Sequence, residues 1–215
     1  MNRCRPHLVP ADPLDLRLRH LTDARLIGVL KAAASASGWQ PRSARKICAP
    51  RTGISTGRGL ACVACEGQNG YAAAVADVDV NLDSGLVHPR RFIVALDCGP
   101  VSNPDGLRNQ VEGGILQGMS RALVEEVSWD DKCVKSTDWE SYSSLRLDYD
   151  IPVVQCVFVE PENVPAAGAG ETAVTVTPAA IGNAVYDATG IRLRDVPFIA
   201  ARLRAAPHKS ERPPA

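Results

Sequence analysis

The sequence lacks an excess of charge, an apolar run of membrane length and a secretory leader. Lysine plus arginine number 24, as do aspartate plus glutamate, so the formal net charge is zero. This balance argues against nucleic acid or an anionic membrane as a main partner. The arginines near the N-terminus are not followed by the apolar stretch of a secretory signal, and no apolar run could span a bilayer. We therefore expect a cytoplasmic protein with no membrane span.

Paired spacings of metal ligands or disulfides are also missing. The seven cysteines are an odd number, scattered along the chain, whereas a secreted disulfide framework more often has an even set at tight spacings. Cys62 and Cys65 form a lone CxxC motif, and a zinc site there would need His88 or a second pair. The apolar residues around the motif favour a buried strand with structural thiols, while a metal or redox role stays open.

The apolar periodicity predicts an α+β fold. Runs rich in valine, alanine and isoleucine indicate strands, and apolar residues at helical spacing indicate the helices between and after them. The expected strands are 59–65, 71–80, 86–96 and 153–160, and the expected helices are 23–38, 107–127, 179–188 and 196–206. Early strands joined by hairpins, with helices interspersed, favour a mixed or antiparallel sheet with packed helices.

Composition divides the chain into three parts. Residues 1–22 are predicted to be a partly disordered lead-in, residues 23–206 the folded domain, and residues 207–215 a disordered tail. Residues 39–58 hold prolines and glycines amid basic side chains. That composition predicts a connecting loop, which is the candidate internal boundary of the domain.

Glycines interrupt the predicted helix 107–127 at positions 113, 114 and 118. Each costs a helix interior about 1 kcal/mol relative to alanine. Two explanations account for these glycines equally well: close approach of a ligand or another backbone, and plain helix packing against small residues. Gln110, Glu112 and Gln117 lie on or beside the same face, and glutamine offers both donors and an acceptor to a ligand. By themselves these three are ordinary surface residues.

A glycine-rich loop delivers one carboxylate in the sequence Ala167-Gly168-Ala169-Gly170-Glu171. The glycines let the chain pass close to a bulky ligand, and a carboxylate held there can act as a general base. Taken alone, this glutamate is explained better as a solvated residue at a turn. The loop also imitates a dinucleotide-binding fingerprint, but the third glycine of that motif is absent, so this interpretation is rejected.

Five motifs, taken in their order along the chain, resemble one family. They are Asp97-Cys98-Gly99, Asn103-Pro104-Asp105-Gly106, Gln110-Val111-Glu112-Gly113-Gly114, Gly168-Ala169-Gly170-Glu171 and Pro178-Ala179-Ala180-Ile181-Gly182. Over residues 12–206 the chain resembles the C-terminal half of xanthine dehydrogenase-type molybdopterin-binding subunits, in the bacterial branch with isoquinoline, nicotinate and aldehyde oxidoreductases. Five motifs in the right order are far more specific than any one of them.

The resemblance implies a part of a molybdenum hydroxylase. Such an enzyme oxidatively hydroxylates an electrophilic carbon of an N-heterocycle or aldehyde, with water as the oxygen source. Glu171 matches the family's general base, and Gln110 matches a glutamine that contacts the pterin. Gly168, Ala169 and Gly170 match positions near the metal centre, and no residue of this chain is expected to ligate the metal itself.

The resemblance also implies partners, because members of the family are several-fold longer. The missing N-terminal half of the large subunit would share the molybdenum–molybdopterin cofactor with this chain. Iron–sulfur clusters would lie on a partner subunit, since the chain has no four-cysteine spacing of the ferredoxin kind. A small molecule is the expected substrate. The alternative is a truncated, catalytically inactive remnant that acts at most as an association module.

Overall fold

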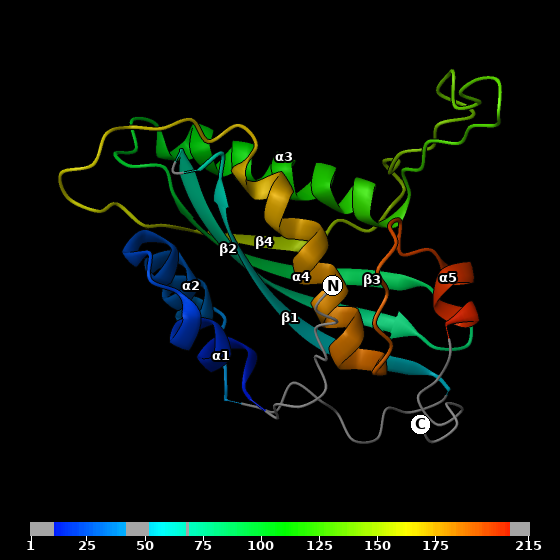
Figure 1. The fold of residues 1–215 in the computed structure, drawn as a ribbon, viewed down its shortest axis with the longest axis horizontal. Coiled ribbons are helices and arrows are strands. Elements are labelled where there is room, and N and C mark those ends of the chain that lie inside the picture. Colours follow the sequence, from blue (N-terminus) through cyan, green and yellow to red (C-terminus); the bar gives the residue numbers. More distant parts are fainter. Residues whose placement is uncertain (1–10, 42–51, 68, 207–215) are drawn as a thin grey trace.

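A four-stranded sheet forms the centre of the protein. The computed structural model describes residues 11–41, 52–67 and 69–206. Its strands are β1 (Ile54–Cys65), β2 (Gly70–Asn81), β3 (Val87–Asp97) and β4 (Val153–Phe158). They lie in the order β1-β2-β3-β4, with antiparallel pairing up to β3 and β4 parallel to β3 (Figure 1). The predicted α+β fold with a mixed sheet is confirmed.

Helices cover both faces of this sheet (Figure 1). On one face lie α1 (Pro13–His20) and α2 (Ala24–Ala36), and on the other lie α3 (Pro104–Leu123) and α4 (Thr172–Thr189). The short helix α5 (Ala200–Ala205) packs through its buried Leu203 against the hydrophobic cluster that lies between the sheet and helices α3 and α4. Among the described residues, no helix is long and apolar enough to cross a membrane. Because the sheet is the middle of three layers, its strands must be apolar on both sides.

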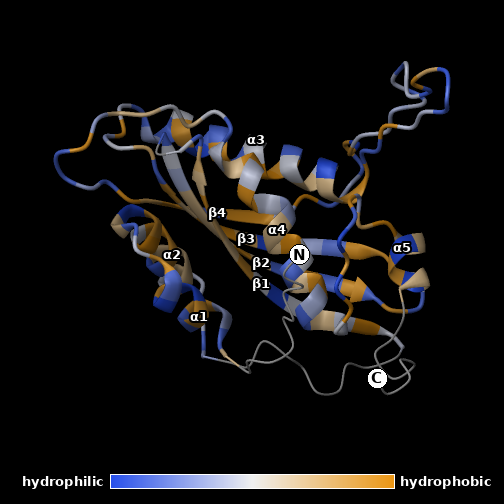
Figure 2. Ribbon diagram, viewed as in Figure 1, coloured by the Kyte–Doolittle hydropathy of each residue, from blue (hydrophilic) through white to orange (hydrophobic). Residues whose placement is uncertain are grey.

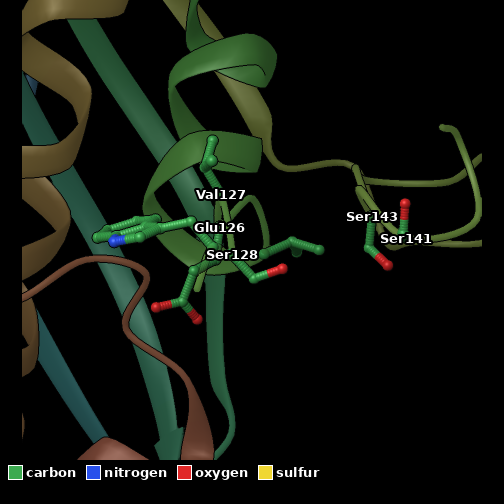
Figure 3. A pocket seen from close by; sticks show the side chains of 7 residues that line it. Glu126, Val127, Ser128, Ser141 and Ser143 are labelled. Atoms are coloured by element: carbon green, nitrogen blue, oxygen red, sulfur yellow. The ribbon is translucent and has the colours of Figure 1, made fainter. Parts of the chain in front are cut away.

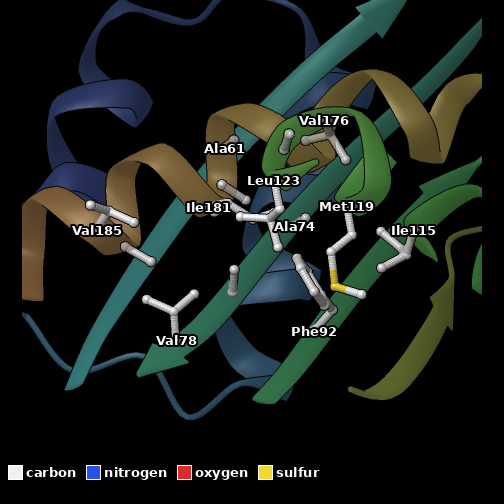
Figure 4. Close-up of a cluster of buried hydrophobic side chains, with 14 of the residues drawn as sticks. Ala61, Ala74, Val78, Phe92, Ile115, Met119, Leu123, Val176, Ile181 and Val185 are labelled. Atoms are coloured by element: carbon white, nitrogen blue, oxygen red, sulfur yellow. The ribbon is translucent and has the colours of Figure 1, made fainter. Parts of the chain in front are cut away.

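Strand β2 satisfies this requirement with small side chains. Ala72 and Ala74 face the cluster under α3 and α4, while Ala73 and Val75 face the cluster under α2, and all four are fully buried. Figure 2 shows apolar residues along the strands and a mixture of polar and apolar residues along α3. In Figure 4 the larger side chains of the core, such as Phe92, fill the space between the sheet and the two helices above it.

Helix α4 lies directly on β1. A Cβ atom built at Gly59 would stand 2.1 Å from the carbonyl oxygen of Ala180, and one at Gly57 would stand 2.1 Å from that of Ala184. Real Cβ atoms do not come so close to backbone, so only glycine fits at either position. The alternation Gly57, Gly59 on one side of the strand therefore sets how closely the helix packs.

Polar side chains of α4 also bind the backbone of β1. Asn183 Nδ2 donates to the carbonyl of Leu60 at 2.9 Å, and Asp187 Oδ2 accepts the N–H of Arg58 at 2.9 Å. Because β1 is an edge strand, these bonds occupy backbone groups that would otherwise be open to a strand of another molecule.

Two element boundaries differ from the prediction where they matter for the site. Helix α4 begins at Thr172 and not at 179, with Pro178 inside it. The prediction was wrong because proline and several β-branched residues of low helix propensity precede Ala179, whereas Ala173 is buried and packs against α3. Strand β1 likewise begins at Ile54, inside the segment expected to be a loop.

The remaining boundaries shift by a few residues. Helix α3 begins at Pro104 and ends at Leu123, where 107–127 was expected, and α5 is shorter than the expected 196–206. Helix α1 forms within the predicted lead-in, where Asp12 caps it by accepting the N–H groups of Leu14 and Asp15 at 2.9 Å. Residues 1–10, 42–51 and 207–215 lie outside the described residues, and with them the predicted tail and much of the predicted loop. The division into lead-in, domain and tail stays a prediction.

A long irregular arm, residues 124–152, connects α3 to β4 and projects away from the sheet (Figure 1). Its tryptophans are exposed, Trp129 by 73% and Trp139 by 88%. The arm returns to the body near Leu145, whose N–H donates to Ser120 Oγ at 3.0 Å, and near Tyr149, which packs on the core. The outer part of the arm thus adds little to the core.

Candidate active site

Glu171 lies at the junction of the glycine-rich loop and α4. It is the N-cap residue of that helix, and its carbonyl accepts the N–H groups of Val174 at 3.0 Å and Thr175 at 3.3 Å. Its side chain makes no capping hydrogen bond and is exposed. The helix therefore fixes the backbone of Glu171 and leaves the carboxylate open to a ligand.

Gln110 reaches the same place from α3. Its Nε2 donates to the carbonyl of Gly170 at 2.9 Å, although the two residues are 60 positions apart. Gly168 and Gly170 are exposed, and a Cβ built at either meets nothing within 4 Å. Ala169 differs from them, since it is half-buried and packs against the core. The motif that contains Gln110 and the glycine-rich loop thus meet beside Glu171, and the backbone of the loop is open to a ligand at Gly168 and Gly170.

The three glycines of α3 have different surroundings. A Cβ built at Gly114 would lie 3.0 Å from the Cβ of Ala173, and one at Gly118 would lie 2.7 Å from the Cβ of Thr177. Both glycines therefore serve the packing of α3 on α4, as one of the two explanations proposed. Gly113 is exposed and would meet nothing within 4 Å. Helix packing does not explain this third glycine.

Gly113 belongs to an exposed stripe of α3. Gln110, Gly113 and Gln117 are spaced by three and four residues, which places them on one side of the helix, and all three are exposed. Glu112 lies apart from this stripe, half-buried near β4. There, burial and secondarily the charge of Glu112 raise the pKa of Cys156 to about 11. Of the polar residues singled out on this helix, only the two glutamines flank Gly113.

The loop before Glu171 is seated on the end of β3. The N–H of Ala167 donates to the carbonyl of Cys98 at 2.8 Å. Gly99 has φ +73°, and a Cβ there would stand 2.3 Å from the carbonyl oxygen of Pro165. The Asp97-Cys98-Gly99 motif, which the sequence offered only as part of a family resemblance, therefore forms the turn on which the loop packs.

Sequence reasoning missed one contributor, Arg25 of α2. Its Nη2 lies 2.6 Å from Oδ1 of Asp97, the first residue of that turn. An ion pair between positions 72 apart leaves no local pattern in the sequence. The available signal was the aspartate at the end of an apolar strand, because a buried carboxylate needs a cation or several hydrogen-bond donors.

Known proteins similar to the chain include a molybdenum-binding subunit of an aldehyde oxidoreductase from Escherichia coli. A model of the molybdopterin cofactor-binding domain matches residues 63–154, which include α3. A nicotinate dehydrogenase subunit of Pseudomonas putida is 36% identical over 201 residues, 91% of this chain and 17% of the relative. The beta subunit of isoquinoline 1-oxidoreductase from Brevundimonas diminuta is 32% identical over 189 residues, 87% of this chain and 23% of the relative. The crystal structure of quinoline 2-oxidoreductase from Pseudomonas putida has a TM-score of 0.59 at 28% identity, over 67% of this chain and 19% of that chain.

The chain belongs to the molybdopterin-binding subunits of the xanthine oxidase family. It spans only about a fifth of the length of these relatives, between 17% and 23%. The residues that match the molybdopterin cofactor-binding domain include Gln110 and Gly113, and Glu171 lies C-terminal to them in this molybdopterin-binding subunit.

The site fits a molybdenum that is held by its own organic ligand. The chain offers open glycine backbone, glutamine amides and one exposed carboxylate, which are groups that contact a ligand by hydrogen bonds and close approach. In the part of the chain that the structure describes, no three histidine, cysteine or acidic side chains gather as a metal site. Groups of this chemistry are able to bind an organic ligand such as a pterin by hydrogen bonds.

Cys62 and Cys65 of this molybdopterin-binding subunit do not share a site. Both lie on β1, where residues three apart are separated by roughly 10 Å and point to opposite faces. His88 pairs with Asp79 at one end of β2, while Cys65 pairs with Gly70 at the other. The distance along the sheet excludes a zinc site made of these three residues.

A hollow at the base of the arm lies at the opposite end of α3 (Figure 3). It is lined by Val124, Glu126, Val127, Ser128, Trp129, Ser141 and Ser143. The helical rise separates Gln110 from Val124 by about 20 Å. This hollow is therefore distinct from the surroundings of Glu171.

Proposed function

We propose that this chain forms the C-terminal wall of the active site of a molybdenum hydroxylase, with Glu171 as the general base. The reaction is the oxidative hydroxylation of an electrophilic carbon, with water as the oxygen source. The observation that carries the proposal is the hydrogen bond from Gln110 Nε2 to the carbonyl of Gly170 at 2.9 Å, which joins the exposed stripe of α3 to the residue before Glu171. The names of the relatives, which include nicotinate dehydrogenase, isoquinoline 1-oxidoreductase and an aldehyde oxidoreductase, support an N-heterocycle or an aldehyde as substrate.

Each residue has a distinct part in this proposal. The molybdenum cofactor, when bound, supplies the two-electron oxidation and activates the oxygen that comes from water. The carboxylate of Glu171 accepts the proton of the attacking oxygen as its bond to the substrate carbon forms. Gln110 positions the loop by its bond to Gly170 and offers its amide oxygen to the pterin. Gly113 and Gly168 have no side chain in the way of a close ligand.

The rest of the active site comes from partners. The chain spans 17% of the nicotinate dehydrogenase subunit and 23% of the isoquinoline 1-oxidoreductase subunit. We infer that the N-terminal part of the large subunit closes the cofactor site over the exposed stripe of α3, and that an iron–sulfur subunit takes up the electrons. Exposure of Gln110, Gly113 and Glu171 supports this inference, because a base and a cofactor work best where a second wall excludes water.

Co-expression tests the proposal. The chain is produced with the N-terminal part of an isoquinoline-type large subunit and its iron–sulfur subunit, and molybdenum content and turnover are measured. Glu171→Gln should keep the molybdenum and lower turnover by about 10² to 10⁴, the range for loss of a positioned base. Glu162→Gln is the matched control, because Glu162 is an exposed glutamate on the same loop.

Equal turnover of the two variants would contradict the role of Glu171 as base. Loss of molybdenum in Glu171→Gln alone would point to a role in binding and contradict the proposal in the same way. The second candidate function is an inactive association module. Its signature is a stable complex with the partners that retains no molybdenum.

A further inference from the structure

Arg25, which is partly exposed, and Asp97, which is buried, form an ion pair between α2 and the end of β3. The side chain of Asp97 is 0% exposed, and it accepts two hydrogen bonds from Arg25, Nε to Oδ2 at 2.8 Å and Nη2 to Oδ1 at 2.6 Å. The guanidinium carbon lies 4.6 Å from the ring centroid of Tyr71, whose hydroxyl donates to Asp23 Oδ2 at 3.0 Å. Bidentate pairing and stacking together hold the guanidinium in one orientation.

Stability alone does not account for this pair. A buried ion pair can often be replaced by apolar residues without loss of stability, and Tyr71 and Ile93 already provide an apolar cluster on this side of the sheet. Asp97 has a further contact that no apolar residue could make. Its Oδ1 accepts the N–H of Gly99 at 3.0 Å, which closes a tight turn with Gly99 at φ +73°.

That turn carries the loop that leads to Glu171. The carbonyl of Cys98 accepts the N–H of Ala167, and Gly99 has no Cβ where Pro165 passes. No helix or strand forms between β4 and α4. The path of the loop therefore depends on a few contacts, and two of them are made by the turn that Asp97 closes.

We propose that Arg25 and Asp97 are positioning residues that set the place of Glu171 relative to Gln110. The inference rests on the proposed role of Glu171 as the general base. Hydrogen bonds connect Arg25 to Asp97, Asp97 to the turn at Gly99, and that turn to Ala167, four residues before Glu171. Gln110 holds the loop from the other side, at Gly170. Positioning matters because a displacement of about 1 Å can cost a catalytic group roughly 10²-fold in rate.

Amide hydrogen exchange on the full chain tests the first half of this inference. Arg25→Leu combined with Asp97→Leu removes both charges, so that no unpaired charge is buried and the domain still folds. The N–H of Ala167 should then exchange about tenfold faster or more, since the turn loses a charge-assisted hydrogen bond. Peptides from the centre of β2 should exchange as in the parent protein. Asp97→Asn, which keeps an oxygen for Gly99, should give an intermediate rate.

Two matched variants separate positioning from general stability. Arg58→Leu with Asp77→Leu removes another ion pair, 2.5 Å from Nε to Oδ1, which joins β1 to β2, and it should leave the exchange of Ala167 unchanged. Arg25→Lys keeps a charged donor for Asp97 and should restore much of the protection. Parental exchange of Ala167 in the double leucine variant, or an equal increase in the Arg58 and Asp77 variant, would overturn the proposal.

Turnover of the assembled enzyme tests the link to Glu171. The double leucine variant should keep its molybdenum and lose turnover by about tenfold or more, following the displacement argument. Full turnover with a rapidly exchanging loop would refute the link, even where Glu171→Gln is inactive. Conversely, an active Glu171→Gln enzyme would refute the base and leave the exchange measurement to decide whether the pair holds the loop.

Discussion

Replacing Gly59 with alanine should force α4 away from β1. The added Cβ would stand 2.1 Å from the carbonyl oxygen of Ala180 and 2.2 Å from the nitrogen of Ala184. Ordinary contacts between such atoms are about 3.5 Å, so the two elements must separate by more than 1 Å. Rotation of a side chain cannot relieve the contact, because both neighbours belong to the helix backbone. The helix itself has to move.

The expected loss follows from what the helix leaves behind. A gap of 0.5 to 1 Å removes roughly a quarter to a half of the dispersion energy at the contact. Forced overpacking of this kind costs about 1–3 kcal/mol, and losing the hydrogen bond from Asn183 to Leu60 adds about 1 kcal/mol. A total near 3 kcal/mol corresponds to a fall in Tm of about 6–12 °C for a protein of this size.

Urea titration followed by circular dichroism measures this loss, with Gly28→Ala as the matched control. Gly28 lies inside α2, and a Cβ there meets nothing within 4 Å. The control should gain about 0.5–1 kcal/mol, because alanine is the better helix former. A Gly59→Ala protein within about 0.5 kcal/mol of the parent, where ordinary surface substitutions fall, would refute the argument that β1 requires glycine under α4.

Four further predictions concern single features. Gly113→Ala should stabilise the chain by about 0.5–1 kcal/mol and lower molybdenum retention in the assembled enzyme; unchanged retention would remove this glycine from the cofactor wall. Because burial raises the pKa of Cys156 to about 11, iodoacetamide at pH 8 should label exposed Cys133 first, as mass spectrometry of peptides would show, and the reverse order would contradict that burial. The N–H of Leu26 lowers the pKa of Asp23 below 3.8. Its stabilising charge is therefore present above that pH and lost below it, so Asp23→Ala should cost about 1 kcal/mol at pH 7 and less below pH 3.8 in urea titrations; an equal cost at both pH values would contradict it. Replacing residues 130–142 of the arm by a short glycine–serine linker should leave the urea midpoint nearly unchanged, and a clear fall would show that the outer arm supports the core.

Local patterns were sufficient for most of the fold. The predicted helix 23–38 matches α2, with Asp23 as its N-cap and Gly38 at φ +63° just beyond its end. Helix α4 was predicted too short because Pro178 and its β-branched neighbours disfavour a helix locally. The first turn is stabilised by packing on α3, about 60 residues earlier in the chain, where Gly114 and Gly118 make room for it. Tertiary contact overrides local propensity there.

The candidate site was predictable only in part, for the same reason. Ordered motifs predicted Gln110 and Glu171 as candidates, but no pattern predicts the hydrogen bond from Gln110 to Gly170 or the pairing of Arg25 with Asp97, which join residues 60 and 72 positions apart. The glycines of α3 were ambiguous because a sequence shows that space is needed and does not show what fills it. Two of them face a helix and one faces open space, and only the folded structure separates these cases.

Glu171 combines a fixed backbone with an open side chain, and the two properties have different origins. The backbone is held within this chain. Helix α4 fixes it on the C-terminal side, and the hydrogen bonds from Ala167 to Cys98 and from Gln110 to Gly170 fix it on the N-terminal side. The carboxylate is exposed, and a carboxylate is a stronger base when fewer water molecules bind it. Whatever covers the stripe at Gln110 and Gly113 would also remove water from Glu171. In the proposed enzyme, closure of the cofactor site and activation of its base would therefore be one event.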